Sequence, residues 1–329
     1  MLKQFRYLIT VLTLFTGSLA AYIHPCPGEW GIQAEFLYLY PSVDDTYFVI
    51  DSSSFIPVQG RRENNDFDFH PGFRIGAVYG LCGCNQEIQL FYTRLGADEN
   101  KTVRGEDLFA TLGTPDLTVS VFQGYEGFAT SDLDLLYQRV DALYAFQALN
   151  CCSFQLYLQG GLEFGYIRLH ENYVYQETVG DLDLGTINQK SRAWGVGPQF
   201  GIGFDYALWQ CGSGYVPGTL SLNVLSSGSL LASKTGSRTF QVFNGDIILD
   251  VKDQKTWRII PAWHARVGLN YGMCFSCFNS SLEVGYEFNS YSRAISRISA
   301  PDDVSPGLIL TEYYNYDVQG LYIALGFTF

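Results

Sequence analysis

The chain has 329 residues, of which 47% are apolar and 16% aromatic, whereas only 16% are charged. Its formal net charge of −13 argues against a nucleic-acid partner, because binding to phosphates relies on basic surfaces. The chain contains 34 Gly, 23 Tyr and 24 Phe, a composition that favours strands over helices. We therefore expect an all-β protein.

The first twenty residues have the pattern of a secretory signal peptide. Lys3 and Arg6 form a charged start, residues 7–15 an apolar core, and residues 18–20 a small-residue cleavage site. The apolar core is too short for a membrane-spanning helix, and no run of roughly 18 apolar residues follows it. Residues 21–329 show no linker-like change in composition, so we expect a single domain after cleavage.

Ten segments of the remaining chain alternate apolar and polar residues with a period of two, which is typical of strands with one apolar face. They are residues 30–40, 67–79, 87–95, 133–149, 154–170, 194–208, 219–231, 257–271, 281–291 and 317–329. In the fourth segment the apolar face changes parity around Gln138 to Val140, which predicts a β-bulge there.

The connections between these segments alternate in length. Four short turns are expected at 80–86, 150–153, 209–218 and 272–280, and five long loops separate the other segments. The stretch 239–251 has an Asn-Gly centre and is interpreted as a hairpin within a long loop, although it could raise the strand count to twelve. Short periplasmic turns and long external loops are typical of outer-membrane barrels.

The last segment, 317–329, is strongly apolar on one face and ends on Phe329. An unpaired apolar edge strand invites aggregation, whereas in a closed barrel the last strand pairs with the first. Strands of this length span a bilayer when tilted by about 45°. We therefore predict a single transmembrane antiparallel β-barrel of about ten strands. We expect outer-membrane lipid to surround this barrel. We also expect the assembly machinery of the bacterial outer membrane to recognise the terminal Phe329.

The polar face of each strand would then point into the barrel lumen. The charged and amide residues on this face are the pore-lining candidates: Gln33, Glu35, Asp68, Arg74, Glu87, Glu163, Gln199, Asp205, Arg258, His264, Arg266, Glu283 and Glu287. Opposed acidic and basic walls would set the selectivity of a pore. Alternatively, the charges pair and plug the barrel, because barrels of about eight strands are filled by side chains.

Eight cysteines remain after the signal peptide: Cys26, Cys82, Cys84, Cys151, Cys152, Cys211, Cys274 and Cys277. All of them lie in the N-terminal lead or in and beside the short turns, where the periplasm permits disulfides. The bonds could staple neighbouring turns, or they could link the protein to itself or to other envelope proteins. A zinc site using Cys274, Cys277, Cys82 and Cys84 is a third, less favoured possibility, and no metal or other cofactor is expected.

Four residues could suggest an enzyme at the external rim, namely Asp68, His70, His170 and Glu171. Residues two apart on any strand share a face, so the pairing of Asp68 with His70 carries little weight. The chain has no Gly-x-Ser-x-Gly motif, P-loop or His-Glu-x-x-His motif. We expect no enzymatic activity and assign no catalytic residue.

Five segments together resemble the Legionella-type major outer-membrane-protein family of pore-forming barrels, whose relatives occur in chlamydia-like bacteria. They read WGIQAEFLYLYP, FHPGFRIGAVYG, IQLFYTRLG, DLDLLYQRVDALYA and WGVGPQFGIGFDYALW. The resemblance implies a porin through which small hydrophilic solutes diffuse, and the acidic external loops favour cations. The alternative is a non-conducting barrel that acts as a surface adhesin or antigen and as a disulfide-linked structural protein of the envelope.

Overall fold

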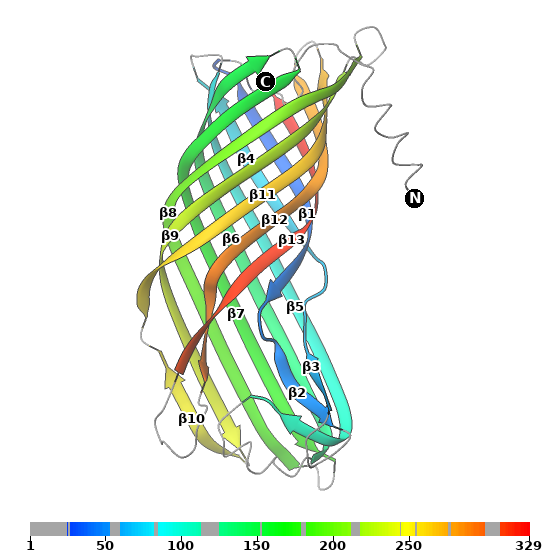
Figure 1. The fold of residues 1–329 in the computed structure, drawn as a ribbon, viewed down its shortest axis with the longest axis vertical. Helices are drawn as coiled ribbons and strands as arrows, with labels where there is room; N and C mark the ends of the chain where they lie inside the picture. The colour runs from blue at the N-terminus through cyan, green and yellow to red at the C-terminus, as the bar shows by residue number, and fades with distance from the viewer. Residues whose placement is uncertain are drawn as a thin grey trace.

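The computed structural model forms one sheet that closes into a barrel (Figure 1). It describes residues 25, 27–52, 60–81, 85–112, 125–151, 153–178, 182–211, 218–243, 245–253, 255–275, 278–299 and 310–329. Among these residues no helix is long and apolar enough to cross a membrane. The predicted signal peptide, residues 1–20, lies outside the described residues.

Thirteen strands in the described part of the chain make up this sheet. They are β1 (Trp30–Val43), β2 (Tyr47–Ser52), β3 (Gly60–Asn64), β4 (His70–Gly80), β5 (Gln86–Ala110), β6 (Tyr125–Cys151), β7 (Phe154–Glu177), β8 (Leu182–Cys211), β9 (Gly218–Phe243), β10 (Asp246–Lys252), β11 (Thr256–Cys274), β12 (Asn279–Ser299) and β13 (Leu310–Thr328). Ten of them form an antiparallel ring, as predicted, and β2, β3 and β10 lie outside it.

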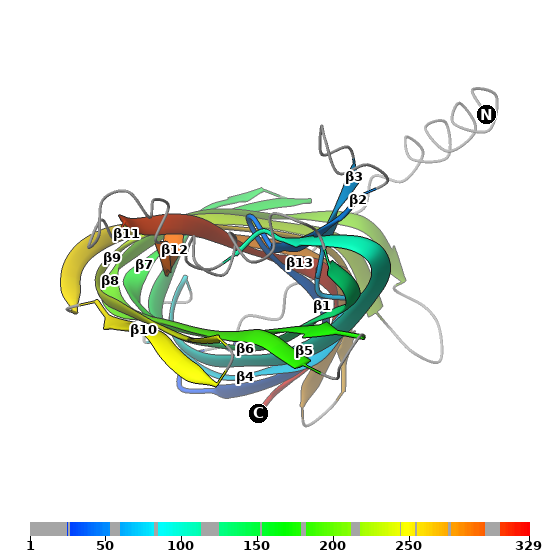
Figure 2. The ribbon, with the colours of Figure 1, turned by 90° about the horizontal axis from the view of Figure 1, so that it is seen from below.

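The ring is closed by the first and last of its strands. β1 pairs with β13 in continuous register from Gly31 opposite Thr328 to Val43 opposite Tyr316. The backbone of Trp30 also exchanges two hydrogen bonds of 2.9 Å with that of Phe329. The predicted pairing of the C-terminal strand with the first is therefore confirmed, and Figure 2 shows the complete ring from one end.

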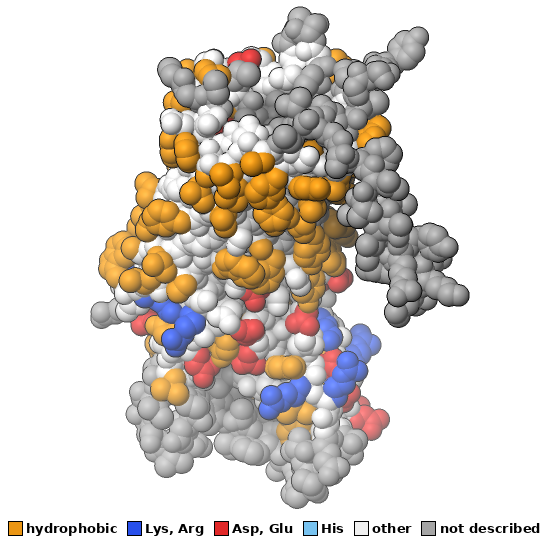
Figure 3. Space-filling view, turned by 45° about the horizontal axis from the view of Figure 1, so that its top comes forward, with side chains coloured by type: hydrophobic (Ala, Val, Ile, Leu, Met, Phe, Trp, Pro, Cys, Tyr) orange, Lys and Arg blue, Asp and Glu red, His pale blue; other side chains and the backbone are white. Residues whose placement is uncertain are grey.

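The outward side chains of the ring form an apolar belt, which we define as the zone of exposed aliphatic and aromatic residues between the aromatic rows at its two edges. Phe200 and Ile259 are among its members, with 70% and 67% of their surface exposed. Figure 3 shows this belt across one face, with charged side chains beyond it. Such a surface is stable against lipid and would be unstable in water.

Beyond the belt the strands continue into a region that we call the extension, at the end of the barrel opposite the short turns (Figure 1). Parts of the predicted long loops are strands instead, so that prediction was wrong in part. β5 has 25 residues, β6 has 27 and β8 has 30, and each continues into a segment predicted as a loop. The β2–β3 hairpin joins the end of β5, and β10 pairs with the end of β9. The polar sequences of these segments suggested loops, but a strand whose outer face meets water accepts polar residues.

The predicted hairpin at 239–251 is confirmed as the turn between β9 and β10. Gly245 at this turn has a φ of 86°, a left-handed conformation that glycine adopts without strain. This hairpin belongs to the extension, so the alternative of twelve barrel strands is not needed.

The predicted bulge near Gln138 was wrong. β6 keeps its register with both neighbours through this point, and its irregularity lies between Gln147 and Leu149 instead. Leu135, Tyr137 and Arg139 all point into the barrel. The apparent change of parity arises because the barrel interior is apolar in the extension and polar within the belt.

Candidate functional site

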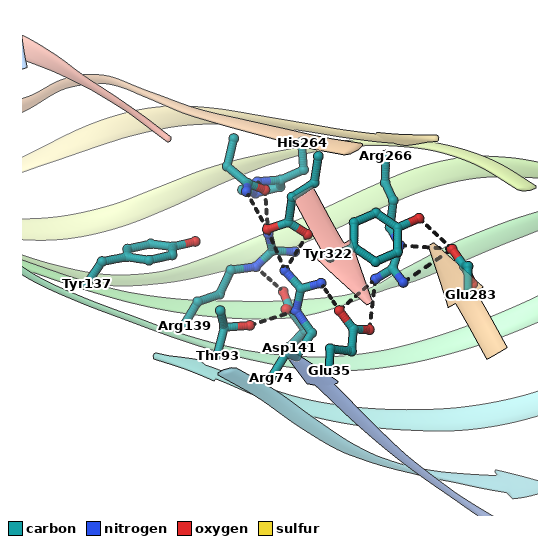
Figure 4. Close-up of polar contacts among 12 residues, drawn as sticks. Glu35, Arg74, Thr93, Tyr137, Arg139, Asp141, His264, Arg266, Glu283 and Tyr322 are labelled. Atoms are coloured by element: carbon teal, nitrogen blue, oxygen red, sulfur yellow. Dashed lines mark hydrogen bonds and ion pairs between the residues drawn. The ribbon is translucent and has the colours of Figure 1, made fainter. Parts of the chain in front are cut away.

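Four buried ion pairs cross the barrel interior at the depth of the apolar belt (Figure 4). Arg74 on β4 contacts Glu35 on β1 at 2.7 Å and Glu287 on β12 at 2.9 Å. Arg266 on β11 contacts the same Glu35 at 2.8 Å and Glu283 on β12 at 3.3 Å. Glu35 therefore joins two arginines, and the group ties together four strands of the ring.

Strand register explains why these residues meet. Glu35 lies directly opposite Arg74, and Arg266 lies directly opposite Glu287. Opposite residues of an antiparallel pair place their side chains on the same face, here the inner one. The Tyr322 ring on β13 then stacks on the Arg266 guanidinium at 3.7 Å and hydrogen-bonds to Glu283.

A second group of charges links β6 and β7, on the opposite wall, to β11. Arg139 on β6 contacts Asp141 at 2.8 Å and approaches Glu163 on β7 at 3.9 Å. His264 on β11 contacts Glu163 at 2.9 Å through Nε2 and Asn289 at 2.9 Å through Nδ1. Together the two groups form a layer of paired charges across the barrel, which we call the charge layer.

Three tyrosines cover the charge layer on the side of the extension. The hydroxyls of Tyr137 and Tyr291 are 2.9 Å apart, and the Tyr291 hydroxyl donates to Glu163 at 2.8 Å. The Tyr316 ring lies 5.5 Å from the Tyr137 ring and 6.1 Å from the Tyr291 ring. Apolar side chains such as Leu95 and Leu135 fill the barrel beyond this tyrosine layer. The described side chains thus close the barrel on the extension side of the charges.

A cavity of about 100 Å³ lies against the charge layer on the side of the short turns. It is large enough for several water molecules, since about 10–15 Å³ of such volume holds one. Polar side chains nearer the turns, such as Gln159 and Asn223, complete its walls. Its lining includes five carboxylates and three guanidinium groups: Glu35, Glu87, Asp141, Glu283, Glu287, Arg74, Arg139 and Arg266.

Most of the predicted pore-lining residues point into the barrel, but not all of them meet. Nine are buried inside: Glu35, Arg74, Glu87, Glu163, Gln199, Asp205, His264, Glu283 and Glu287. Gln33 and Arg266 are half-buried beside the cavity. Arg258 stacks on Tyr313 at 3.8 Å, away from the charge layer, and Asp68 is exposed and precedes β4.

Arg139, Asp141 and the tyrosine layer were not predicted from the sequence. The assumed bulge at 138–140 interrupted the inner face of β6, so its two charged residues were not assigned to the lumen. Uninterrupted alternation of the odd-numbered residues of β6 would have found them. Tyr291 was predicted as the last residue of a strand, and Tyr316 lay just before the last predicted segment, so neither was assigned to the lumen.

The four residues considered for an enzyme do not form one group. His70 contacts Glu99 at 3.3 Å, and His170 contacts Asn188 at 2.8 Å. Glu171 is buried and paired with Arg297 at 2.6 Å, whereas Asp68 is exposed. Within the described ranges, no group of three His, Cys, Asp or Glu could hold a metal ion.

Only one predicted disulfide residue can be described in full. Cys151 ends β6, is exposed and has a free thiol. Cys211 and Cys274 end β8 and β11 at the same rim, and their side chains are not among those described. Cys26, Cys82, Cys84, Cys152 and Cys277 lie outside the described residues, so the disulfides remain a prediction.

A closed ring of ten tilted strands, an apolar outer belt and a charged interior define a transmembrane β-barrel of the bacterial outer-membrane class. The chain belongs to the family described as the Legionella pneumophila major outer membrane protein precursor, whose model matches residues 24–329. The family resemblance and the outer-membrane location expected from the sequence are therefore confirmed.

Solved structures with a similar arrangement are remote in sequence. The outer membrane protease OmpT from Escherichia coli is 10% identical, with a TM-score of 0.43, and the match covers 93% of this chain and 98% of that one. OprG from Pseudomonas aeruginosa is 12% identical, with a TM-score of 0.29 and the same coverage. The P. putida toluene transporter TodX is 9% identical, with a TM-score of 0.31, covering 95% and 94%. A comparison with curated protein sequences found no match.

Proposed function

We propose that the protein is a narrow, gated pore that admits small hydrophilic solutes, with a preference for cations. The observation that carries this proposal is the cavity inside the belt, whose lining has five carboxylates against three guanidinium groups. An excess of carboxylates in a confined space attracts cations and repels anions. Membership of a family of major outer membrane proteins supports an abundant, general role.

The tyrosine layer is the proposed gate. A solute that reaches the cavity from the side of the short turns meets Tyr137, Tyr291 and Tyr316, which are fully buried and in mutual contact. Opening a path would require these side chains to rotate and the apolar side chains beyond them to move apart. It would not break strand pairing, because the ring itself is closed by backbone hydrogen bonds. The hydrogen bond from Tyr291 to Glu163 links the gate to the charge layer.

The conductance of the refolded protein in a planar bilayer tests this proposal. With a salt gradient across the bilayer, we expect brief, small openings and a reversal potential on the cation-selective side. A chain that inserts fully folded and never conducts would contradict the proposal, as would anion selectivity.

The second candidate is a non-conducting barrel that serves as a surface and envelope structural protein. It is favoured by one observation: the arginines of the charge layer are all paired, and an apolar core fills the extension. A folded but silent protein, released from envelopes as a monomer only after reduction, would support this candidate instead.

A further inference from the structure

Basic residues gather in a groove on the outer wall, where β7, β8 and β9 leave the apolar belt. The groove has a volume of about 560 Å³, and its lining contains seven Lys and Arg against two Asp. The whole chain has only 20 Lys and Arg and a net charge of −13, so about a third of its cations lie here. We call this feature the basic groove.

The strand registers order the groove in rows that run around the barrel. Tyr166, Trp194, Lys234 and Trp257 lie opposite one another in one row, at the edge of the belt. The row on the belt side of it is Phe164, Val196, Ala232 and Ile259, which is apolar throughout. The wall therefore changes from apolar to aromatic to basic over a few residues, the order expected across a membrane interface.

The two rows beyond the aromatic row bring like charges together. Arg168 lies directly opposite Arg192, and Lys190 lies directly opposite Arg238. Like charges in directly opposite positions destabilise a sheet. A nearby anion, from the protein or from its surroundings, would relieve this repulsion.

The protein supplies only part of this compensation. Arg168 contacts Asp134 at 3.1 Å, and Arg238 contacts Asp250 at 2.8 Å. The hydrogen bond from Arg238 also lowers the pKa of the Asp250 carboxyl. Lys190 and Arg192 form no ion pair within the described part of the chain, although β8 presents both of them outward and exposed.

Other features of the groove favour a ligand over bare solvent. Gly236 lies opposite Arg192, and a Cβ at this position would come within 3.3 Å of the Lys255 side chain. The glycine thus leaves the floor of the groove open between two cations. The Nε atom of Arg168 is buried and has no hydrogen-bond partner among the described residues.

We propose that the basic groove binds the phosphorylated headgroup of a lipid of the surrounding leaflet, with the acyl chains lying on the apolar and aromatic rows. Phosphate matches the donors of Arg and Lys, and the position of the groove at the edge of the belt places those donors at headgroup height. A free anion would use the basic rows alone, whereas a lipid also uses Trp194 and Trp257 beside them. The inference is independent of any pore.

The purified protein in detergent, probed by native mass spectrometry with bisphosphorylated lipid A, tests this assignment. We expect Arg192→Gln to weaken lipid binding about fivefold, as for the loss of one basic residue near an anionic surface. Arg94→Gln, which removes an exposed arginine of β5 outside the groove, is the matched control and should leave binding unchanged. Heat-modifiable migration on gels would show that both variants are folded.

Two further binding measurements distinguish a lipid headgroup from free phosphate as the ligand. Lipid A without phosphate should bind at least about fivefold more weakly than the bisphosphorylated form. Inorganic phosphate alone should bind weakly and displace the lipid only at high concentration. Equal losses for Arg192→Gln and Arg94→Gln, equal binding of the two lipids, or full displacement by dilute inorganic phosphate would each overturn the proposal.

Discussion

The long strands β5 to β9 run through both the apolar belt and the extension, but the sidedness of the barrel is opposite in the two regions. Within the belt, residues such as Ile202 point outward to lipid, and charged residues such as Glu35 are buried inside. In the extension, Lys190 points outward, and Ile187, three residues earlier on β8, is fully buried inside. A strand therefore keeps its period of two while the chemistry of its two faces is exchanged, because the surroundings of the outer wall change from lipid to water.

The largest expected effect comes from breaking the charge layer. Glu35→Gln leaves Arg74 and Arg266 each without one carboxylate in a buried setting, so we expect a loss of about 3–5 kcal/mol in the free energy of unfolding. A urea titration of the protein in lipid vesicles measures it. Glu126→Gln, which changes an exposed acid on β6, is the control. Equal losses in the free energy of unfolding for the two variants would show that the buried ion pairs contribute no more than an exposed carboxylate.

The apolar interior of the extension gives the second prediction. Ile187→Ala should cost about 2–5 kcal/mol, since it leaves a cavity in a packed core. Ile259→Ala on the belt should cost less, because lipid chains fill the space that the smaller side chain leaves. The same titration compares them, and the reverse order would contradict the assignment of the two zones.

The outer wall gives the third prediction. Ile202 is about midway between Trp194 and Trp209, so Ile202→Arg places a charge near the bilayer centre and should cost roughly 2–4 kcal/mol. Thr186→Arg on the same face of β8 lies in the extension and should change stability by less than about 0.5 kcal/mol. Equal costs would mean that the belt does not end where the charged residues begin.

The smallest expected effect concerns selectivity. Arg266→Gln removes a cation that lines the cavity, so the ratio of potassium to chloride permeability should rise about twofold. Arg258→Gln removes a guanidinium that stacks on Tyr313 away from the cavity, and it should leave the ratio unchanged. Reversal potentials in a salt gradient measure the permeability ratio of both variants. Equal shifts would mean that the charges lining the cavity do not set the selectivity.

The sequence was sufficient to predict the barrel, its ten strands and the closing pair of β1 with β13, because alternation against lipid is a local property of each strand. It was not sufficient in the extension, where polar residues on the outer face of β5 and β8 have the composition of loops. The charge layer depends on register across the ring: Glu35 and Arg266 are far apart in sequence and on strands that are not adjacent. The basic groove likewise requires the registers of β7, β8 and β9 together.

We propose that tyrosines close a path through the charge layer. The most direct test compares the single-channel conductance of Tyr291→Ala with that of Tyr286→Ala, because both residues lie on β12, one in the buried gate and one on the lipid face. We predict that Tyr291→Ala raises the conductance or open time at least about twofold and that Tyr286→Ala matches the unmodified protein. No conductance in folded Tyr291→Ala, or the same change in both variants, would contradict the account.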